Sequence, residues 1–165
     1  TAAITKIFKE LRTPFIINQP RYNMFNRDVE TDLFPVLERE GKAATSYSSL
    51  SQGLLTDKYL QGIDENSRAK KQTIPFLSPV QVEETLETVK KLNEVAKKRG
   101  QSLAQMALAW NLRKPVVASV LIGASRVQQV INNVNALKNL GFTDDELMQI
   151  DQILAAQSPI DWDAR

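Results

Sequence analysis

The fold is decided by the stretch SVLIGASR at residues 119–126. Its first half is apolar and partly β-branched, which predicts a buried strand over residues 119–122. Its second half contains glycine and serine, and Ser125 with Gln128 predicts the capped start of a helix. A buried strand that leads directly into a helix is typical of a parallel sheet with helical crossovers.

Two further strands are predicted upstream. Residues 14–20 form an apolar run between prolines, which predicts a buried strand, and residues 43–48 predict a weaker one. Helical spacing and capping signals predict helices over residues 2–11, 29–40, 78–99, from 102, from 126 and 143–156. The polar connection over residues 51–77 is long enough to suggest a functional role. Three strands are too few for a barrel and few for an open doubly wound sheet, so the α/β chain looks like half of a larger fold.

Composition excludes several classes of function. The 165 residues contain no cysteine and no histidine, which excludes thiolate catalysis, Ser-His-Asp triads and the usual zinc sites. A formal net charge of +2 argues against a nucleic-acid partner. No apolar stretch reaches the length of a membrane span and no signal peptide opens the chain, so we expect a cytoplasmic protein without a membrane partner.

Polar groups follow each predicted strand, at the edge where parallel α/β folds place their sites. After the third strand, a glycine, a helix N-terminus and Arg126 together are suited to a phosphate. The alternative is that Ser125 only caps the helix and Arg126 is solvated. Tyr47 is either a platform for a flat ring or an aromatic at the rim of the core. Gln19 either grips an amide or satisfies neighbouring backbone.

Three segments together resemble the aldo-keto reductase superfamily, in the bacterial branch related to the potassium-channel beta subunits. They are NQPRYNMFNR at 18–27, SLSQGLLTDKY at 49–59 and VLIGASR at 120–126. The resemblance implies a (β/α)8 TIM barrel that binds NADPH without a Rossmann fold. Residues 1–165 would be the C-terminal half of a single NADP-binding barrel domain, supplying about the last three strands and the C-terminal helices.

The resemblance also implies roles for residues near the nicotinamide and the pyrophosphate. Gln19 corresponds to the glutamine that holds the nicotinamide carboxamide, and Tyr47 to the aromatic that stacks on the nicotinamide ring. The residues expected along the pyrophosphate are Ser48, Ser49, Leu50, Ser51 and Gln52. Lys58 and Arg68 correspond to basic loop residues that fold over the cofactor, although charged loop residues are often only solvated.

The adenosine end of the cofactor is implied to lie after the third strand. The 2′-phosphate site would comprise Gly123, Ser125, Arg126 and Gln129, and Asn132 with Asn133 would face the adenine. Arg126 favours NADPH over NADH, because a guanidinium binds a 2′-phosphate and gains nothing from a bare hydroxyl. The chain departs from the family at Ser49, where proline is common, and at Asn132, where glutamate is common.

The family's catalytic tyrosine, aspartate, lysine and histidine have no counterpart in this sequence. Tyr22, Tyr47 and Tyr59 each lie in a segment with another family role, so no catalytic residue and no metal ligand is assigned. The leading hypothesis is NADPH-dependent reduction of a small-molecule aldehyde or ketone by the intact protein. The alternatives are a non-catalytic NADPH-binding redox sensor like the channel beta subunits, and an inactive half-barrel. A homo-oligomer is possible on each reading.

Overall fold

The structure is a computed structural model that describes residues 2–63, 69, 77–158 and 160. Three short strands form one parallel sheet in the order β1 (Ile17–Asn18), β2 (Ala43–Ser46) and β3 (Val117–Val120). Each pair of neighbouring strands is connected through helices, as parallel pairing requires. The prediction of a parallel α/β sheet is therefore confirmed.

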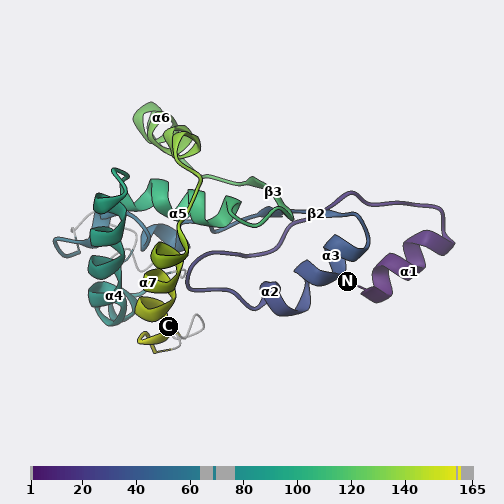
Figure 1. Cartoon of the computed structure of the whole chain (residues 1–165), viewed down its shortest axis with the longest axis horizontal. Coiled ribbons are helices and arrows are strands. Elements are labelled where there is room, and N and C mark those ends of the chain that lie inside the picture. The colour runs from purple at the N-terminus through teal and green to yellow at the C-terminus, as the bar shows by residue number, and fades with distance from the viewer. Residues whose placement is uncertain (1, 64–68, 70–76, 159, 161–165) are drawn as a thin grey trace.

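Helices surround this sheet unevenly (Figure 1). The α-helices are α1 (Ala2–Glu10), α2 (Val29–Asp32), α3 (Phe34–Arg39), α4 (Pro79–Lys98), α5 (Leu103–Leu112), α6 (Val127–Val134) and α7 (Asp144–Ala155). Three short 3-10 segments lie at η1 (Ser51–Gly53), η2 (Asp57–Tyr59) and η3 (Asn135–Lys138). Helices α4, α5 and α7 gather at one end of the molecule, α1 lies at the other, and α6 projects from the sheet beside α5, which it contacts.

The start signals for three helices were predicted correctly. Reciprocal capping boxes join Ser78 with Gln81, Ser102 with Gln105, and Thr143 with Glu146. Each satisfies backbone N–H groups that a helix start leaves without an intrahelical acceptor.

The helix predicted over residues 29–40 is wrong in detail, because it is broken into α2 and α3. Pro35 has no backbone N–H and restricts the residue before it, so the two short helices are joined at Leu33, whose φ is −104°.

Two strand predictions also need correction. The strand predicted as buried over residues 14–20 shrinks to two residues at a sheet edge, where Ile16 and Ile17 are 75% and 49% exposed. The third strand covers Val117–Val120 instead of residues 119–122. Leu121 and Ile122 follow the strand and are partly exposed, and the Leu121 N–H still donates to the Ser46 carbonyl of β2 at 2.8 Å.

The core packs around Trp110 of α5, which is fully buried. The Tyr22 ring stacks on it at a centroid distance of 5.3 Å and an interplanar angle of 29°. The guanidinium of Arg113 lies 3.5 Å from the Trp110 ring centroid and that of Arg27 lies 5.2 Å from it. Each cation therefore contacts the ring at a distance typical of a cation–π interaction.

Glu30 pairs with both of these cations, and Arg27 also pairs with Asp151 at 2.6 Å. One carboxylate oxygen accepts hydrogen bonds from the Tyr22 hydroxyl at 2.6 Å and from Arg113 at 2.9 Å, and the other pairs with Arg27 at 3.0 Å. Desolvation by itself opposes ionisation of Glu30. The hydrogen bonds from Arg27, Tyr22 and Arg113 outweigh it and lower the pKa of Glu30 to about 2, from an ordinary 4.5.

We expect Glu30→Gln to reduce the free energy of unfolding by roughly 2 kcal/mol at neutral pH, because the partly buried Arg113 loses its carboxylate and Arg27 keeps only Asp151. The carboxylate has a lower pKa in the folded state, so its stabilisation is complete above about pH 4.5 and is lost as pH falls towards 2. In urea titrations, the difference in free energy of unfolding between the unchanged protein and Glu30→Gln should narrow as pH falls over that interval. Glu87→Gln, which removes an exposed pair with Lys90, is the control and should show no measurable change at any pH.

Candidate functional site

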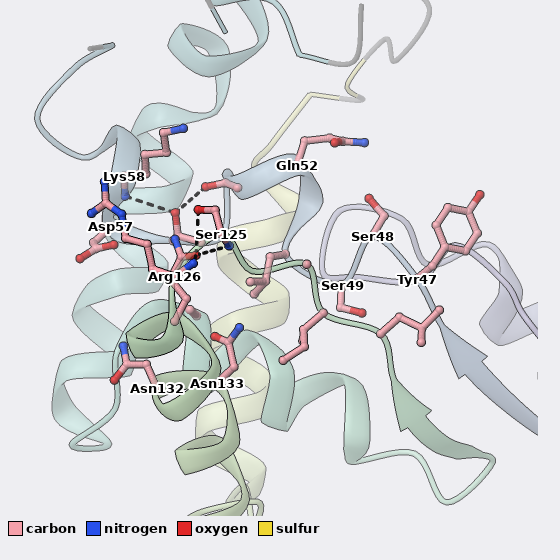
Figure 2. Close-up of a pocket in the computed structure, with 18 residues that line it drawn as sticks. Tyr47, Ser48, Ser49, Gln52, Asp57, Lys58, Ser125, Arg126, Asn132 and Asn133 are labelled. Atoms are coloured by element: carbon pink, nitrogen blue, oxygen red, sulfur yellow. Dashed lines mark hydrogen bonds between the residues drawn. The ribbon is translucent and has the colours of Figure 1, made fainter. Parts of the chain in front are cut away.

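A pocket of about 1020 Å³ lies at the carboxyl ends of β2 and β3 (Figure 2). Its first wall follows β2 and contains Tyr47, Ser48, Ser49, Leu50, Gln52, Gly53, Thr56, Asp57 and Lys58. Its second wall contains Ala104 together with Leu121, Ile122, Gly123, Ser125, Arg126, Gln129, Asn132 and Asn133. The two walls come from segments about 70 residues apart, which the parallel pairing of β2 with β3 brings together.

The loop after β2 has a strained backbone. Ser48, Ser51 and Gln52 have φ values of 56°, 47° and 59°, the left-handed region that side chains other than glycine rarely adopt. Such residues gather at functional sites, where the surrounding structure holds them. Beneath this loop, the buried Ser46 hydroxyl lies 3.3 Å from the Ser49 hydroxyl and 3.3 Å from the Asn111 side-chain oxygen.

The segment carrying Lys58 is fixed by Thr56. The Thr56 hydroxyl donates to the Gly53 carbonyl at 2.7 Å and accepts from the Lys58 N–H at 3.2 Å, which caps η2. Asp57 and Lys58 are both exposed on the pocket wall. Asp57 was missed from the sequence, although the Thr-Asp-Lys order is a recognisable cap signal for a short helical turn.

The second wall turns at the start of α6, and the cap predicted there is wrong. The N-cap residue is Arg126, one position after Ser125, and Gln129 takes the part expected of Gln128. The Gln129 side-chain oxygen accepts from the backbone N–H groups of Ser125 at 2.8 Å and Arg126 at 3.2 Å. The cap therefore lies one residue later than predicted, at Arg126, which lines the pocket. A Cβ built on Gly123 would meet nothing within 4 Å, so the space beside it is open to a ligand.

Helix α6 is held to the fold by few groups. Gln105 of α5 donates to the Asn132 carbonyl at 3.1 Å, and Asn133 is the buried residue of the helix. The apolar side chains Val127 and Val134 are 76% and 54% exposed.

The structure brings together most of the residues singled out from the sequence. Twelve line the pocket: Tyr47, Ser48, Ser49, Leu50, Gln52, Lys58, Gly123, Ser125, Arg126, Gln129, Asn132 and Asn133. Gln19, an exposed residue just beyond β1, and Ser51, whose buried hydroxyl has no partner among the described residues, do not line it. Arg68 lies outside the described residues. Besides Asp57, the residues that sequence reasoning missed are Gly53, Thr56, Ala104, Leu121 and Ile122.

The chemistry of the walls suits an elongated polar ligand with an anionic end. Figure 2 shows the half-exposed Tyr47 at one end and Arg126 with Lys58 at the other. Hydroxyl and amide side chains line the space between them. Arginine and lysine are the side chains that hold phosphates in proteins, and an exposed aromatic ring is a stacking surface.

Two other kinds of site were also sought. Over residues 2–63, 69, 77–158 and 160, no group of three or more acidic side chains is placed to hold a metal ion. Within the same residues, no helix combines the length and the apolar character that crossing a membrane requires.

Comparison with known proteins identifies the family. The sequence model of the Aldo/keto reductase family matches residues 1–155, so the chain belongs to this family. It is 44% identical over 159 residues to the L-glyceraldehyde 3-phosphate reductase of Escherichia coli K12, covering 94% of this chain and 46% of that protein. It is 36% identical over 144 residues to a Schizosaccharomyces pombe protein named as a voltage-gated potassium channel beta subunit, covering 84% and 42%.

Solved structures agree with this assignment. The glycerol dehydrogenase of Gluconobacter oxydans superimposes with a TM-score of 0.76 at 30% identity, over 98% of this chain and 48% of that one. An aldo-keto reductase of Bacillus halodurans, at 22% identity, shares the fold with a TM-score of 0.64 over 92% and 46%. The chain spans about half the length of the relatives it matches. Its three parallel strands and their helices are thus part of the (β/α)8 barrel of aldo-keto reductases.

Proposed function

We propose that the protein containing this chain is an NADPH-dependent reductase of small aldehydes and ketones. Residues 1–165 would form the C-terminal half of its single NADP-binding barrel domain. The observation that carries the proposal is the pocket at the carboxyl edge of β2 and β3, with an aromatic ring at one end and two cations at the other.

The pocket residues fit NADPH part by part. Tyr47, which is 43% exposed, offers a face on which a nicotinamide ring can stack. The Ser48–Gln52 loop would follow the pyrophosphate. Arg126 and Ser125 would bind the 2′-phosphate, and Asn132 and Asn133 would lie beside the adenine. When bound, the cofactor supplies a hydride to the carbonyl carbon.

This chain would bind and orient, whereas proton transfer belongs elsewhere in the intact protein. The described tyrosines are unsuited to donating a proton in this pocket. Burial is the largest cause that raises the pKa of Tyr22, whose hydroxyl already donates to Glu30. Tyr59 is also buried, and neither residue lines the pocket. Tyr47 is needed as the stacking surface.

The relatives suggest the substrate class. One is named for reducing L-glyceraldehyde 3-phosphate and another as a glycerol dehydrogenase. A short hydroxylated aldehyde or ketone is therefore the proposed substrate. The proposed location is the cytoplasm, and the proposed assembly is a homo-oligomer.

The test uses the full-length protein with NADPH and a panel of short aldehydes and ketones that includes glyceraldehyde. We expect NADPH to be consumed in step with the alcohol formed, and Tyr47→Ala to weaken NADPH binding by roughly tenfold through loss of stacking. Tyr47→Phe is the matched control and should bind as the unchanged protein does. Failure to bind NADPH would overturn the proposal.

A second candidate function is favoured by the similarity to the named channel beta subunit. On this reading, the protein holds NADPH as a redox sensor with little turnover. Micromolar or tighter NADPH binding without carbonyl reduction across the panel would select it over the reductase.

A further inference from the structure

Asn23 does not line the pocket and is fully buried, with every hydrogen-bonding position of its side chain in use. Its Nδ2 donates to the Ser48 carbonyl at 2.9 Å and to the Asn26 Oδ1 at 3.2 Å. Its Oδ1 accepts from the backbone N–H groups of Phe25 at 2.9 Å and Asn26 at 3.1 Å. An asparagine side chain can donate two hydrogen bonds and accept two, so the Asn23 side chain has no further hydrogen bond to offer.

This side chain extends the pairing between the β1 and β2 segments. Beyond the strands, Tyr47 N–H donates to the Pro20 carbonyl at 3.0 Å, and Tyr22 N–H donates to the Tyr47 carbonyl at 3.3 Å. The backbone of Asn23 then turns away to pair with Asn26. The next bond, to the Ser48 carbonyl, is therefore made by the Asn23 side chain in place of a backbone N–H.

The Ser48 carbonyl is the point from which the strained loop begins. Ser48 itself has a φ of 56°, and its carbonyl also accepts from the Ser51 N–H at 2.8 Å, which closes the turn. A left-handed residue other than glycine costs roughly 1–2 kcal/mol and persists only where neighbours hold it. Asn23 is the group outside the loop that holds this carbonyl.

We propose that Asn23 is a positioning residue for cofactor binding, acting through Ser48. By fixing the Ser48 carbonyl, it sets the plane of the peptide that joins Ser48 to Ser49, and both residues line the pocket. The inference rests on the proposed function, in which this loop follows the pyrophosphate. It concerns how the loop is held and assigns Asn23 no contact with the ligand.

Asn23→Asp tests this role in the full-length protein, because the carboxylate keeps the acceptor oxygen and loses the amide donor to the Ser48 carbonyl and to Asn26. At about pH 8 we expect NADPH binding to weaken roughly tenfold, since a carboxylate oxygen then faces the Ser48 carbonyl and the Asn26 Oδ1 with no proton between them. As pH falls towards about 5, a protonated carboxyl can donate to the Ser48 carbonyl again, so affinity should recover to within about threefold. Asn23→Ala should bind weakly at both pH values.

Thr88→Val is the matched control. It removes a 2.6 Å hydrogen bond from the buried Thr88 hydroxyl to Gln157, which joins α4 to the segment after α7 and does not touch the pocket. Stability should fall, whereas the dissociation constant of NADPH, measured by fluorescence titration, should not change. Unchanged binding in both Asn23 variants, or weakening without pH recovery in Asn23→Asp, would overturn the inference.

A measurement without cofactor separates this inference from the proposed function. Amide hydrogen exchange in residues 48–52 should be faster in Asn23→Ala than in Thr88→Val, because the loop has lost its anchor. If the unchanged protein bound no NADPH but the exchange result held, the proposed function would fail while the anchoring role stood. Equal exchange in the two variants would contradict the anchoring role.

Discussion

Arg126→Ala is expected to weaken NADPH binding about 50-fold and to leave NADH binding unchanged within about threefold. The two cofactors differ only in the 2′-phosphate, and Arg126 with Ser125 lines the end of the pocket assigned to it. Losing a charge-assisted hydrogen bond costs about 2–3 kcal/mol, which corresponds to this change in affinity.

Two further variants sharpen this experiment. Arg126→Lys keeps the charge but loses the planar fork of donors. Its NADPH affinity should therefore lie between that of the unchanged protein and that of Arg126→Ala. Lys138→Ala removes a cation outside the pocket lining and should leave both cofactors unaffected. Equal losses for NADPH and NADH in Arg126→Ala would show that Arg126 does not bind the 2′-phosphate.

Trp110→Ala is expected to produce the largest loss of stability, about 4 kcal/mol. The side chain is fully buried, stacks on Tyr22 and carries the guanidinium of Arg113 on its face. Its removal leaves a cavity and strips the cation–π partner from Arg113. Urea unfolding of the full-length protein measures the effect, with the pocket's affinity for NADPH measured alongside.

Trp110→Phe should reduce the free energy of unfolding by much less, roughly 1–2 kcal/mol. The indole Nε1 is buried without a hydrogen-bond partner among the described residues, so phenylalanine removes an unsatisfied donor while keeping an aromatic ring. Equal losses of unfolding free energy in Trp110→Ala and Trp110→Phe would mean that the part of the indole that phenylalanine lacks carries the stabilisation. Stacking of an aromatic ring on Tyr22 would then not explain it.

Local signals in the sequence predicted the parallel sheet and most helix starts. Ser78, Ser102 and Thr143 were recognised as caps because the matching Gln or Glu stands three residues later, and capping depends on that short spacing alone. Tyr47, Ser48 and residues 123–126 were singled out because parallel strands deliver their carboxyl ends to one edge.

The failures arose where tertiary structure decided the outcome. Gln128 and Gln129 both stand near the start of α6, and only the observed register shows that Gln129 forms the cap. The apolar run with Ile16 and Ile17 has the composition of a buried strand, yet burial depends on a neighbour that the described sheet does not supply. Asn23 gave no signal, because its partner Ser48 lies 25 residues away.

The two walls of the pocket differ in how firmly they are held. The Tyr47–Lys58 wall grows out of β2, the strand with a hydrogen-bonded neighbour on both sides, and is tied down by Asn23 and Thr56. The opposite wall is carried by α6, whose apolar side chains are largely exposed. Local opening costs least where few apolar groups are buried. A nucleotide spanning the pocket would therefore contact one firmly held wall and restrict the motion of a softer one, so the entropy lost in ordering α6 would offset part of its binding free energy.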